Sequence, residues 1–569
     1  MQIQRTILWV VFSMSLLFLW DSWQKSNGKP SMFGAPPAAQ VQGEQPGATG
    51  AASDASVPAA SVASQVPSVP GASGSVPVAA AVSTTPAAAM LKLRNDTLAL
   101  EIDPVGGQVR RAELLRHKAT HDAKGKETDN VVLLEDVPGR VYVAQSGLVG
   151  APQGRSFPTH KSTLAVVEGP AEDKDGAAML KLAAESGGVR LVRTYRLKPG
   201  AYVVEVRDEV TNTGAEPVRP TLYVQLTRDG NAPSGESKFY STYTGPVIYS
   251  EARKFEKVDF GSIEKGKADH AKAATDGWAG IIQHYFVSAW IPADKAAREF
   301  FTRKVDNNLY AVGALQALGE IAPQASASVT SRLLIAPQDQ QMLEKVAPGL
   351  DLSVDYGWLT VIAKPIFQLL EWLHGLVGNW GWAIVLLTII IKTLFFPLQA
   401  ASYKSMARMK AVTPRLTALR ERYGNDRVRM NQAMMELYKE EKINPLGGCL
   451  PIVVQIPVFI ALYWVLLASV EMRNAPWIFW IKDLSAPDPW YVMPVIMAGT
   501  MFLQTKLNPT PPDPVQAKVM MFMPIIFSVM FFFFPSGLVL YWLVNNIYSI
   551  AQQWTIQRAF EKAAAAKKK

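Results

Sequence analysis

The hydrophobic and polar positions follow one pattern between residues 91 and 345. Apolar and polar residues alternate there in short runs, at residues 98–103, 191–197, 202–210, 221–227 and 329–335. A period of two residues places neighbouring side chains on opposite faces of a β-strand. The turn residues Lys198-Pro199-Gly200 separate two of these runs and indicate a hairpin. Many short strands with few helical stretches predict a large antiparallel β-sandwich for residues 91–345.

A different pattern occupies the C-terminal third, where long apolar stretches replace the alternation. They lie at residues 379–400, 446–470, 490–507, 519–535 and 537–556. Most approach the ~20 residues that a helix needs to cross a bilayer. We therefore predict an α-helical bundle of five core transmembrane helices in a multidomain membrane protein.

Two other apolar segments differ from these spans. Residues 1–28 contain a short apolar run that ends at Trp20-Asp21-Ser22-Trp23 without a small-x-small cleavage site, which favours a transmembrane signal anchor over a cleaved signal peptide. Residues 350–378 include a polar stripe of Lys364, Gln368 and Glu371 at i, i+4 and i+7. This stripe favours an amphipathic helix lying on the outer membrane surface.

Residues 29–90, rich in Ala, Pro and Ser, are expected to be a disordered linker.

Charge orients these segments. The formal net charge is +9, and residues 402–444 carry ten Lys or Arg against five Asp or Glu. Residues 401–445 are expected to form a basic helical hairpin that turns at Tyr423-Gly424-Asn425-Asp426. The positive-inside rule places this hairpin and the basic tail 557–569 in the cytoplasm. With six spans, both termini are cytoplasmic and the β-sandwich lies outside.

Lys392 is the one charged residue within the predicted span 379–400. It follows Trp380 by 12 residues, or roughly 18 Å along a helix. A water-filled site inside the bundle explains it better than snorkelling to the inner headgroups, although both interpretations are open. Thr388 lies one turn earlier on the same face. Other polar residues inside predicted spans are Gln455, Ser528, Asn545 and Asn546. Each alone fits helix–helix hydrogen bonding, but together with a cation they favour a hydrated cavity.

Several classes of function lack their usual sequence signals. The chain has a single cysteine, Cys449, no P-loop, and six histidines without metal-ligand spacing. We therefore expect no catalytic residue, metal, cofactor or small-molecule substrate. A proton-coupled or sodium-coupled transporter would be expected to have carboxylates inside the spans, and a passive envelope scaffold would leave their polar residues unexplained. For the β-sandwich, a scaffold role is favoured over a carbohydrate-binding or peptide-binding face.

Three motifs carry a resemblance to a known family. They are NPLGGCLPIVVQIPVFIALYWVL at residues 444–466, FWIKDLSAPDPW at 479–490 and FPSGLVLYWLVNN at 534–546. These strongly resemble the YidC/Oxa/Alb family of membrane protein insertases. The anchor, linker and large β-domain are similar in position and class to its Gram-negative members. The resemblance implies an insertase and chaperone of the bacterial inner membrane. It would insert and help fold and assemble membrane proteins, alone or with the Sec translocon, through a hydrophilic groove open to cytoplasm and lipid.

The resemblance also implies roles for individual residues. Lys392 fills a groove position that usually holds arginine, so it keeps the charge but lacks the planar guanidinium fork. The groove would include Lys392, Thr388, Gln455, Ser528 and Tyr541, with Asn545 added from the pattern of polar residues. The hydrophobic slide for an arriving segment would comprise Phe459, Met530 and Trp542. The methionine-rich run that contains Met530 fits lipid-facing packing equally well.

The implied partners are nascent membrane proteins, membrane lipids, the Sec translocon with its accessory subunits, and the ribosome with the signal recognition particle pathway. The β-domain would contact the accessory part of the Sec translocon. The ribosome would meet the hairpin and the tail, and the hairpin residues expected to carry this contact are Arg415, Arg420, Arg422 and Arg427.

Overall fold

The computed structural model describes residues 89–119, 129–233, 242–423, 426–441, 450–507, 521–523 and 528–566. These residues form two compact units: a β-unit up to Ser353 and a helical unit from Val354 onward. The predicted signal anchor, and all of the predicted linker except residues 89 and 90, lie outside the described residues.

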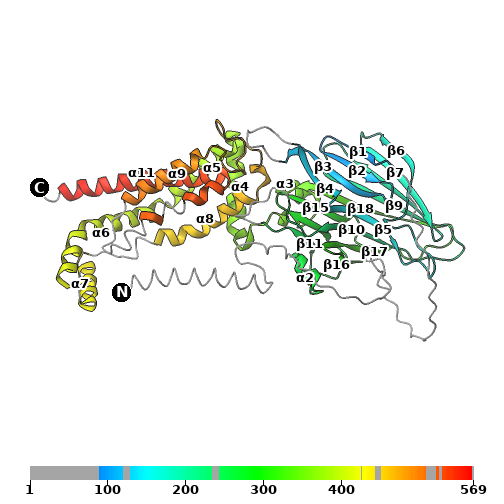
Figure 1. The fold of residues 1–569 in the computed structure, drawn as a ribbon, viewed down its shortest axis with the longest axis horizontal. Helices are drawn as coiled ribbons and strands as arrows, with labels where there is room; N and C mark the ends of the chain where they lie inside the picture. Colours follow the sequence, from blue (N-terminus) through cyan, green and yellow to red (C-terminus); the bar gives the residue numbers. More distant parts are fainter. Residues whose placement is uncertain are drawn as a thin grey trace. The chain divides into compact units, whose positions relative to one another are not determined.

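The described strands of the β-unit form two nine-stranded antiparallel sheets (Figure 1). The first sheet has the order β1(Leu91–Arg94), β2(Leu98–Asp103), β3(Gln108–Lys118), β4(Asn130–Val137), β5(Arg140–Val149), β10(Thr221–Asp229), β17(Leu309–Ala317), β16(Arg298–Asp306), β13(Ala273–Ala274). The second has the order β12(Lys254–Lys257), β11(Gly245–Ser250), β14(Trp278–Gln283), β15(Phe286–Pro292), β18(Ser326–Pro337), β9(Val203–Asn212), β8(Val189–Leu197), β7(Ala178–Ser186), β6(Ala165–Glu172). Two short helices, α2(Phe260–Glu264) and α3(Gln340–Val346), complete the unit. The predicted antiparallel sandwich is confirmed.

The β8–β9 hairpin shows how alternation builds the core of the β-unit. Its turn is the predicted Lys198-Pro199-Gly200, and Leu197 pairs with Val204 across it. Every second residue of β8 from Val189 to Leu197 is buried. Four of these five buried residues are apolar or aromatic, as the period predicts, and the fifth is Arg193.

Arg193 is buried because a carboxylate faces it across the ladder. It pairs in register with Asp208 of β9, and its Nε donates a hydrogen bond to Asp208 Oδ1 over 2.6 Å. Both side chains are 1% exposed. Arg193 Nη1 also donates to the carbonyls of Gly106, at 3.2 Å, and Ser146, at 3.4 Å. Burial lowers the pKa of Arg193, but the charge and hydrogen-bonding interactions with Asp208 and Tyr195 together outweigh burial and leave that pKa above its ordinary value.

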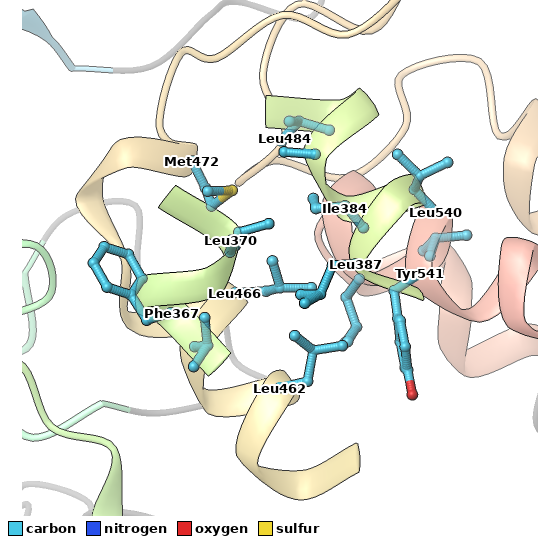
Figure 2. Packing of buried hydrophobic residues seen from close by; sticks show 14 of the residues in the cluster. Phe367, Leu370, Ile384, Leu387, Leu462, Leu466, Met472, Leu484, Leu540 and Tyr541 are labelled. Atoms are coloured by element: carbon cyan, nitrogen blue, oxygen red, sulfur yellow. The ribbon is translucent and has the colours of Figure 1, made fainter. Parts of the chain in front are cut away.

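The helical unit is built from α4(Thr360–Val377), α5(Trp380–Leu394), α6(Phe396–Tyr423), α7(Arg427–Glu440), α8(Leu450–Ala468), α9(Val492–Leu507) and α11(Ser536–Ala566). Short 3-10 turns are η1(Asp351–Ser353), at the end of the β-unit, and η2(Gly357–Leu359), η4(Val470–Met472) and η5(Phe531–Phe533) in the helical unit. One apolar cluster joins α4, α5, α8 and α11 (Figure 2). It includes Phe367, Ile384, Leu462 and Leu540.

α4 takes a full part in this cluster. It buries Ala363, Phe367, Leu370 and Leu373, while Gln368 of the predicted polar stripe is exposed. The amphipathic pattern is therefore real, but the helix begins at Thr360 rather than near residue 350. Its placement on the outer membrane surface stays a prediction.

The predicted span 379–400 is two helices rather than one. α5 ends at Leu394, α6 begins at Phe396, and the chain bends by 65° between them. Pro397 lies in the first turn of α6, where its missing N–H removes one bond that a straight helix would make. Among the described helices, none alone has the length and apolar character to cross a membrane. Only the bent pair 380–394 and 396–409 has them together, and the apolar segments 454–468, 492–507 and 521–533 are shorter.

Two boundaries in the helical unit differ from the predicted ones. The hairpin arm begins at Phe396 instead of residue 401, and α11 runs to Ala566 without a break at residue 556. The tail 557–566 contains Ala, Gln, Glu, Lys and Arg and lacks Gly and Pro, so nothing in it ends a helix.

The helical hairpin closes on its own small apolar cluster. Val412 and Leu416 of α6 pack against Leu437 and Tyr438 of α7. Asp426 caps α7 by accepting hydrogen bonds from the backbone N–H groups of residues 428 and 429. In the sequence, Met430, Met434, Leu437 and Tyr438 follow i, i+4, i+7 and i+8 spacing, which predicts an apolar face on this second helix. Leu437 and Tyr438 of that face form part of the contact.

The buried ion pair gives a stability prediction. Asp208→Asn removes the charge that compensates Arg193, so the free energy of unfolding of the β-unit should fall by about 3 to 5 kcal/mol. The matched control is Glu320→Gln, which breaks the exposed Arg219–Glu320 pair and should cost at most about 1 kcal/mol. Pulse proteolysis of the full chain over a urea series measures both. Equal small effects would contradict a stabilising role for the buried pair.

Candidate functional site

Lys392 lies inside the helical unit and points to α11. Its side chain belongs to α5, the residue is 3% exposed, and its Nζ donates a hydrogen bond to Ser549 Oγ over 2.8 Å. Ser549 Oγ in turn donates to the backbone carbonyl of Asn545 over 2.7 Å. The ammonium is therefore held between two helices, whereas snorkelling would extend it to a surface.

Lys392 has no compensating charge among the residues that the structure describes. Among the described residues, no ion pair includes Lys392, and Ser549 is its hydrogen-bond partner. An ammonium group carries three N–H donors, so a single hydroxyl satisfies one of them. A buried cation with one neutral partner is costly, and this is the arrangement expected at a functional position rather than a structural one.

Further polar side chains continue from this pair across the unit. Gln455 of α8 donates from Nε2 to Asn545 Oδ1 of α11 over 3.2 Å. Gln399 of α6 donates from Nε2 to Gln455 Oε1 over 3.4 Å. Asn545 joins the two halves, since its backbone carbonyl accepts from Ser549 and its side chain accepts from Gln455. We call Lys392, Gln399, Gln455, Asn545 and Ser549 the polar seam.

Some amide atoms near the seam are not satisfied by the protein. Gln399 is 5% exposed, and its Oε1 has no hydrogen-bond partner among the described residues. Gln552, which lies less than one turn beyond Ser549 on α11, is 7% exposed and has no partner in the described part of the chain for either side-chain atom. A buried polar atom left without a partner costs about 1 to 3 kcal/mol, so these positions favour contact with water or a polar ligand.

The polar residues predicted from sequence divide into two groups. Lys392, Gln455 and Asn545 meet in the seam. Thr388 is 1% exposed and donates its hydroxyl to Ile384 O of its own helix over 2.7 Å, and its place in the groove stays a prediction. Ser528 directs its hydroxyl to Met501 Sδ of α9, 3.8 Å away, and Asn546 contacts Met497 Sδ of the same helix at 3.5 Å.

Sequence reasoning missed Ser549 and Gln399. Ser549 lies four residues after Asn545, so both occupy one face of α11, and that spacing is a signal that could have found it. Gln399 lies in the first turn of α6 beyond the bend at Phe395. The bend is not evident from an apolar pattern that continues through it.

Of the three residues of the predicted slide, two are aromatic and in contact, and the third is an exposed methionine. Phe459 and Trp542 meet edge to face with ring centroids 4.6 Å apart. Phe531 contacts Trp542 at 5.7 Å, and its neighbour Met530 is 38% exposed. Tyr541, labelled in Figure 2, is 2% exposed. Its ring stacks on that of Phe459 with centroids 6.1 Å apart. An aromatic group from α8, η5 and α11 thus ends beside an exposed methionine.

The predicted cytoplasmic arginines are described in part. The side chain of Arg415 is 66% exposed and forms a salt bridge of 2.6 Å with Glu441, which links α6 to the C-terminal end of α7. Arg422 is exposed, with its guanidinium 5.7 Å from the ring centroid of Tyr423. The side chains of Arg420 and Arg427 lie outside the described set.

Known proteins match the chain over its full length. Residues 90–369 match the family described as "YidC periplasmic domain", and residues 372–563 match "60Kd inner membrane protein". The "Membrane protein insertase YidC" of Bordetella pertussis is 56% identical over 570 residues, with 100% of this chain and 99% of that protein covered. The protein of the same name from Cupriavidus necator is 55% identical over 568 residues, with the same coverage. The solved structure titled "Active YidC insertase crystal structure with the first transmembrane domain resolved" is 18% identical with a TM-score of 0.38, covering 81% of this chain and 91% of that one.

Proposed function

Because this chain belongs to the YidC family of membrane protein insertases, we propose that its polar seam receives the hydrophilic end of an incoming membrane segment. Insertion of membrane proteins is a non-enzymatic function, and the family acts in the inner membrane with a periplasmic domain, which here is the β-unit. The single observation that carries the proposal is the buried Lys392 ammonium with a neutral hydroxyl as its partner.

The chemistry of the seam suits an acidic or polar arriving chain. A carboxylate that reaches Lys392 gains a charge-assisted hydrogen bond that is stronger than the bond to Ser549. The polar atoms of Gln399 and Gln552 without a protein partner support a hydrated path beside it. Water in the seam lowers the cost of bringing polar groups to this depth, because they keep their hydrogen bonds.

The apolar part of the same segment needs another surface. Exposed Met530 and the aromatic group of Phe459, Phe531 and Trp542 supply it, since a soft thioether and ring faces adapt to varied side chains. The segment then moves into lipid. Transfer of ~20 apolar residues to hydrocarbon drives this step, so no nucleotide is required. The membrane potential adds about 2.3 kcal/mol per 100 mV for each negative charge moved outward.

The topology and partners are further parts of the proposal. Both termini, the hairpin and the basic tail 557–569 are cytoplasmic in a multi-pass arrangement, as the positive-inside rule favours. The ribosome and the signal recognition particle pathway approach the hairpin, and the Sec translocon with its accessory subunits approaches the β-unit. Exposed Arg415 and Arg422 support the first contact because RNA presents a dense negative charge.

The first prediction concerns Lys392. Lys392→Ala removes the cation, so insertion of small membrane proteins with acidic translocated tails should slow on the order of tenfold, the value of one charge-assisted hydrogen bond. Lys392→Arg keeps the charge and should retain function. The matched control is Lys506→Ala, which removes an exposed lysine at the end of α9.

Protease protection of the translocated tail, in cells depleted of the native insertase and complemented with each variant, measures these rates. Normal insertion by Lys392→Ala would contradict the proposed role of the seam. A loss that is equal for acidic and neutral tails would show that the lysine acts through packing instead.

The second prediction concerns the hairpin. Reversal of Arg415, Arg420, Arg422 and Arg427 to Glu should weaken co-sedimentation with ribosomes at low salt, because the contact is electrostatic and screened by salt. The control carries four charge reversals on exposed residues of the β-unit, namely Arg155, Lys174, Lys265 and Lys267. Unchanged sedimentation of the hairpin variant, or an equal loss in the control, would remove the ribosome contact from these arginines.

A further inference from the structure

Ser549 occupies a defined place between the cation and the backbone of α11. It is 3% exposed, accepts from Lys392 Nζ at 2.8 Å and donates to Asn545 O at 2.7 Å. A hydroxyl has one proton to donate. Because that proton goes to the Asn545 carbonyl, the lone pairs of the hydroxyl oxygen are left to face the ammonium. The two bonds therefore form one directed chain from Lys392 through Ser549 to the backbone.

The lysine stem cannot hold this position by itself. It is flexible, with a strongly hydrated charge at its end, and such side chains extend to water when nothing retains them. Among the described residues, Ser549 accepts a hydrogen bond from the ammonium, and no carboxylate forms an ion pair with Lys392. Within the described part of the chain, the Ser549 hydroxyl is therefore the hydrogen-bond acceptor that holds the cation in the seam.

We infer that Ser549 is a positioning residue, which holds Lys392 in the seam before a substrate arrives and releases it to the substrate's carboxylate. The inference rests on the proposed function of Lys392. A neutral hydroxyl suits this task, because a carboxylate binds an ammonium more strongly and displaces it. An Asp or Glu at the same place would hold the lysine in a permanent ion pair and leave nothing for the substrate.

A purely structural role for Ser549 is the alternative explanation. A serine between two helices is often a hydrogen-bonding contact that contributes only to helix association. The structure supplies a control for that role. Thr393 follows Lys392 on α5, and Tyr548 precedes Ser549 on α11. Their hydroxyls form a hydrogen bond of 3.0 Å that does not include Lys392.

A double-mutant cycle in the full chain separates the two explanations. Ser549→Ala should slow the insertion of a single-span protein with an acidic tail about tenfold, whereas Ser549→Thr keeps the hydroxyl and should stay within about twofold of the parent. The double variant Lys392→Ala/Ser549→Ala should be no slower than Lys392→Ala, because Ser549 acts only through the lysine. Thr393→Val and Tyr548→Phe should insert at the parent rate.

A second readout follows Lys392 itself. A water-soluble amine reagent, with site-resolved mass spectrometry of the labelled membrane protein, measures how far the ammonium is exposed. Ser549→Ala should raise labelling of Lys392 severalfold, while Ser549→Thr, Thr393→Val and Tyr548→Phe should leave it low. This measurement does not depend on insertion activity.

The outcomes separate the inference from the proposed function. Unchanged labelling in Ser549→Ala, additive losses in the double variant, or failure of Ser549→Thr to rescue would each overturn the positioning role. Raised labelling together with normal insertion by Lys392→Ala would support the positioning role and overturn the proposed function.

Discussion

The function proposed for the helical unit depends on the Lys392 ammonium group, which is buried with no counter-charge among the described residues. Lys392 is held by Ser549, and the hydrogen bonds of Asn545, Gln455 and Gln399 carry the polar seam across α11, α8 and α6. A cation in such a place lowers stability unless its partners are good, and one hydroxyl is a weak partner. The arrangement makes sense if the missing acceptor arrives with the substrate. The apolar cluster around the seam then supplies the rigidity that keeps it open to that exchange.

The β-unit solves the same electrostatic problem in the opposite way. Arg193 is as buried as Lys392, but Asp208 faces it across a strand pair and two backbone carbonyls accept from its guanidinium. A planar guanidinium with matched acceptors is a stable structural pair. Lysine in the helical unit has neither the fork nor the carboxylate, so its charge stays available. Of these two buried cations, Arg193 thus serves stability and Lys392 the proposed function.

The sequence predicts those parts of the molecule in which a local period sets the structure. Alternation identifies the β8–β9 hairpin and its turn. Helical spacing at i, i+4, i+7 and i+8 identifies the contact of Leu437 and Tyr438 in the helical hairpin. The period also shows where Arg193 interrupts an apolar face, but not that Asp208 pairs with it. The bend after Leu394 escapes the pattern, because the apolar stretch continues through Phe395 and Pro397. Lys392, Gln455 and Asn545 are recognisable as polar residues in apolar surroundings, whereas Ser549 is a small residue whose role emerges only from its two partners.

Site-specific photocrosslinking tests most directly whether the seam is where a membrane segment enters. A photoreactive amino acid at Gln455, in the seam, is compared with one at Ile456, the next residue on α8, which is 47% exposed. Each variant is irradiated with a ribosome-stalled membrane protein whose hydrophilic tail has not yet crossed. We expect adducts with that tail from position 455 and few from position 456. Equal adducts from both positions, or none from 455 while insertion proceeds, would contradict it.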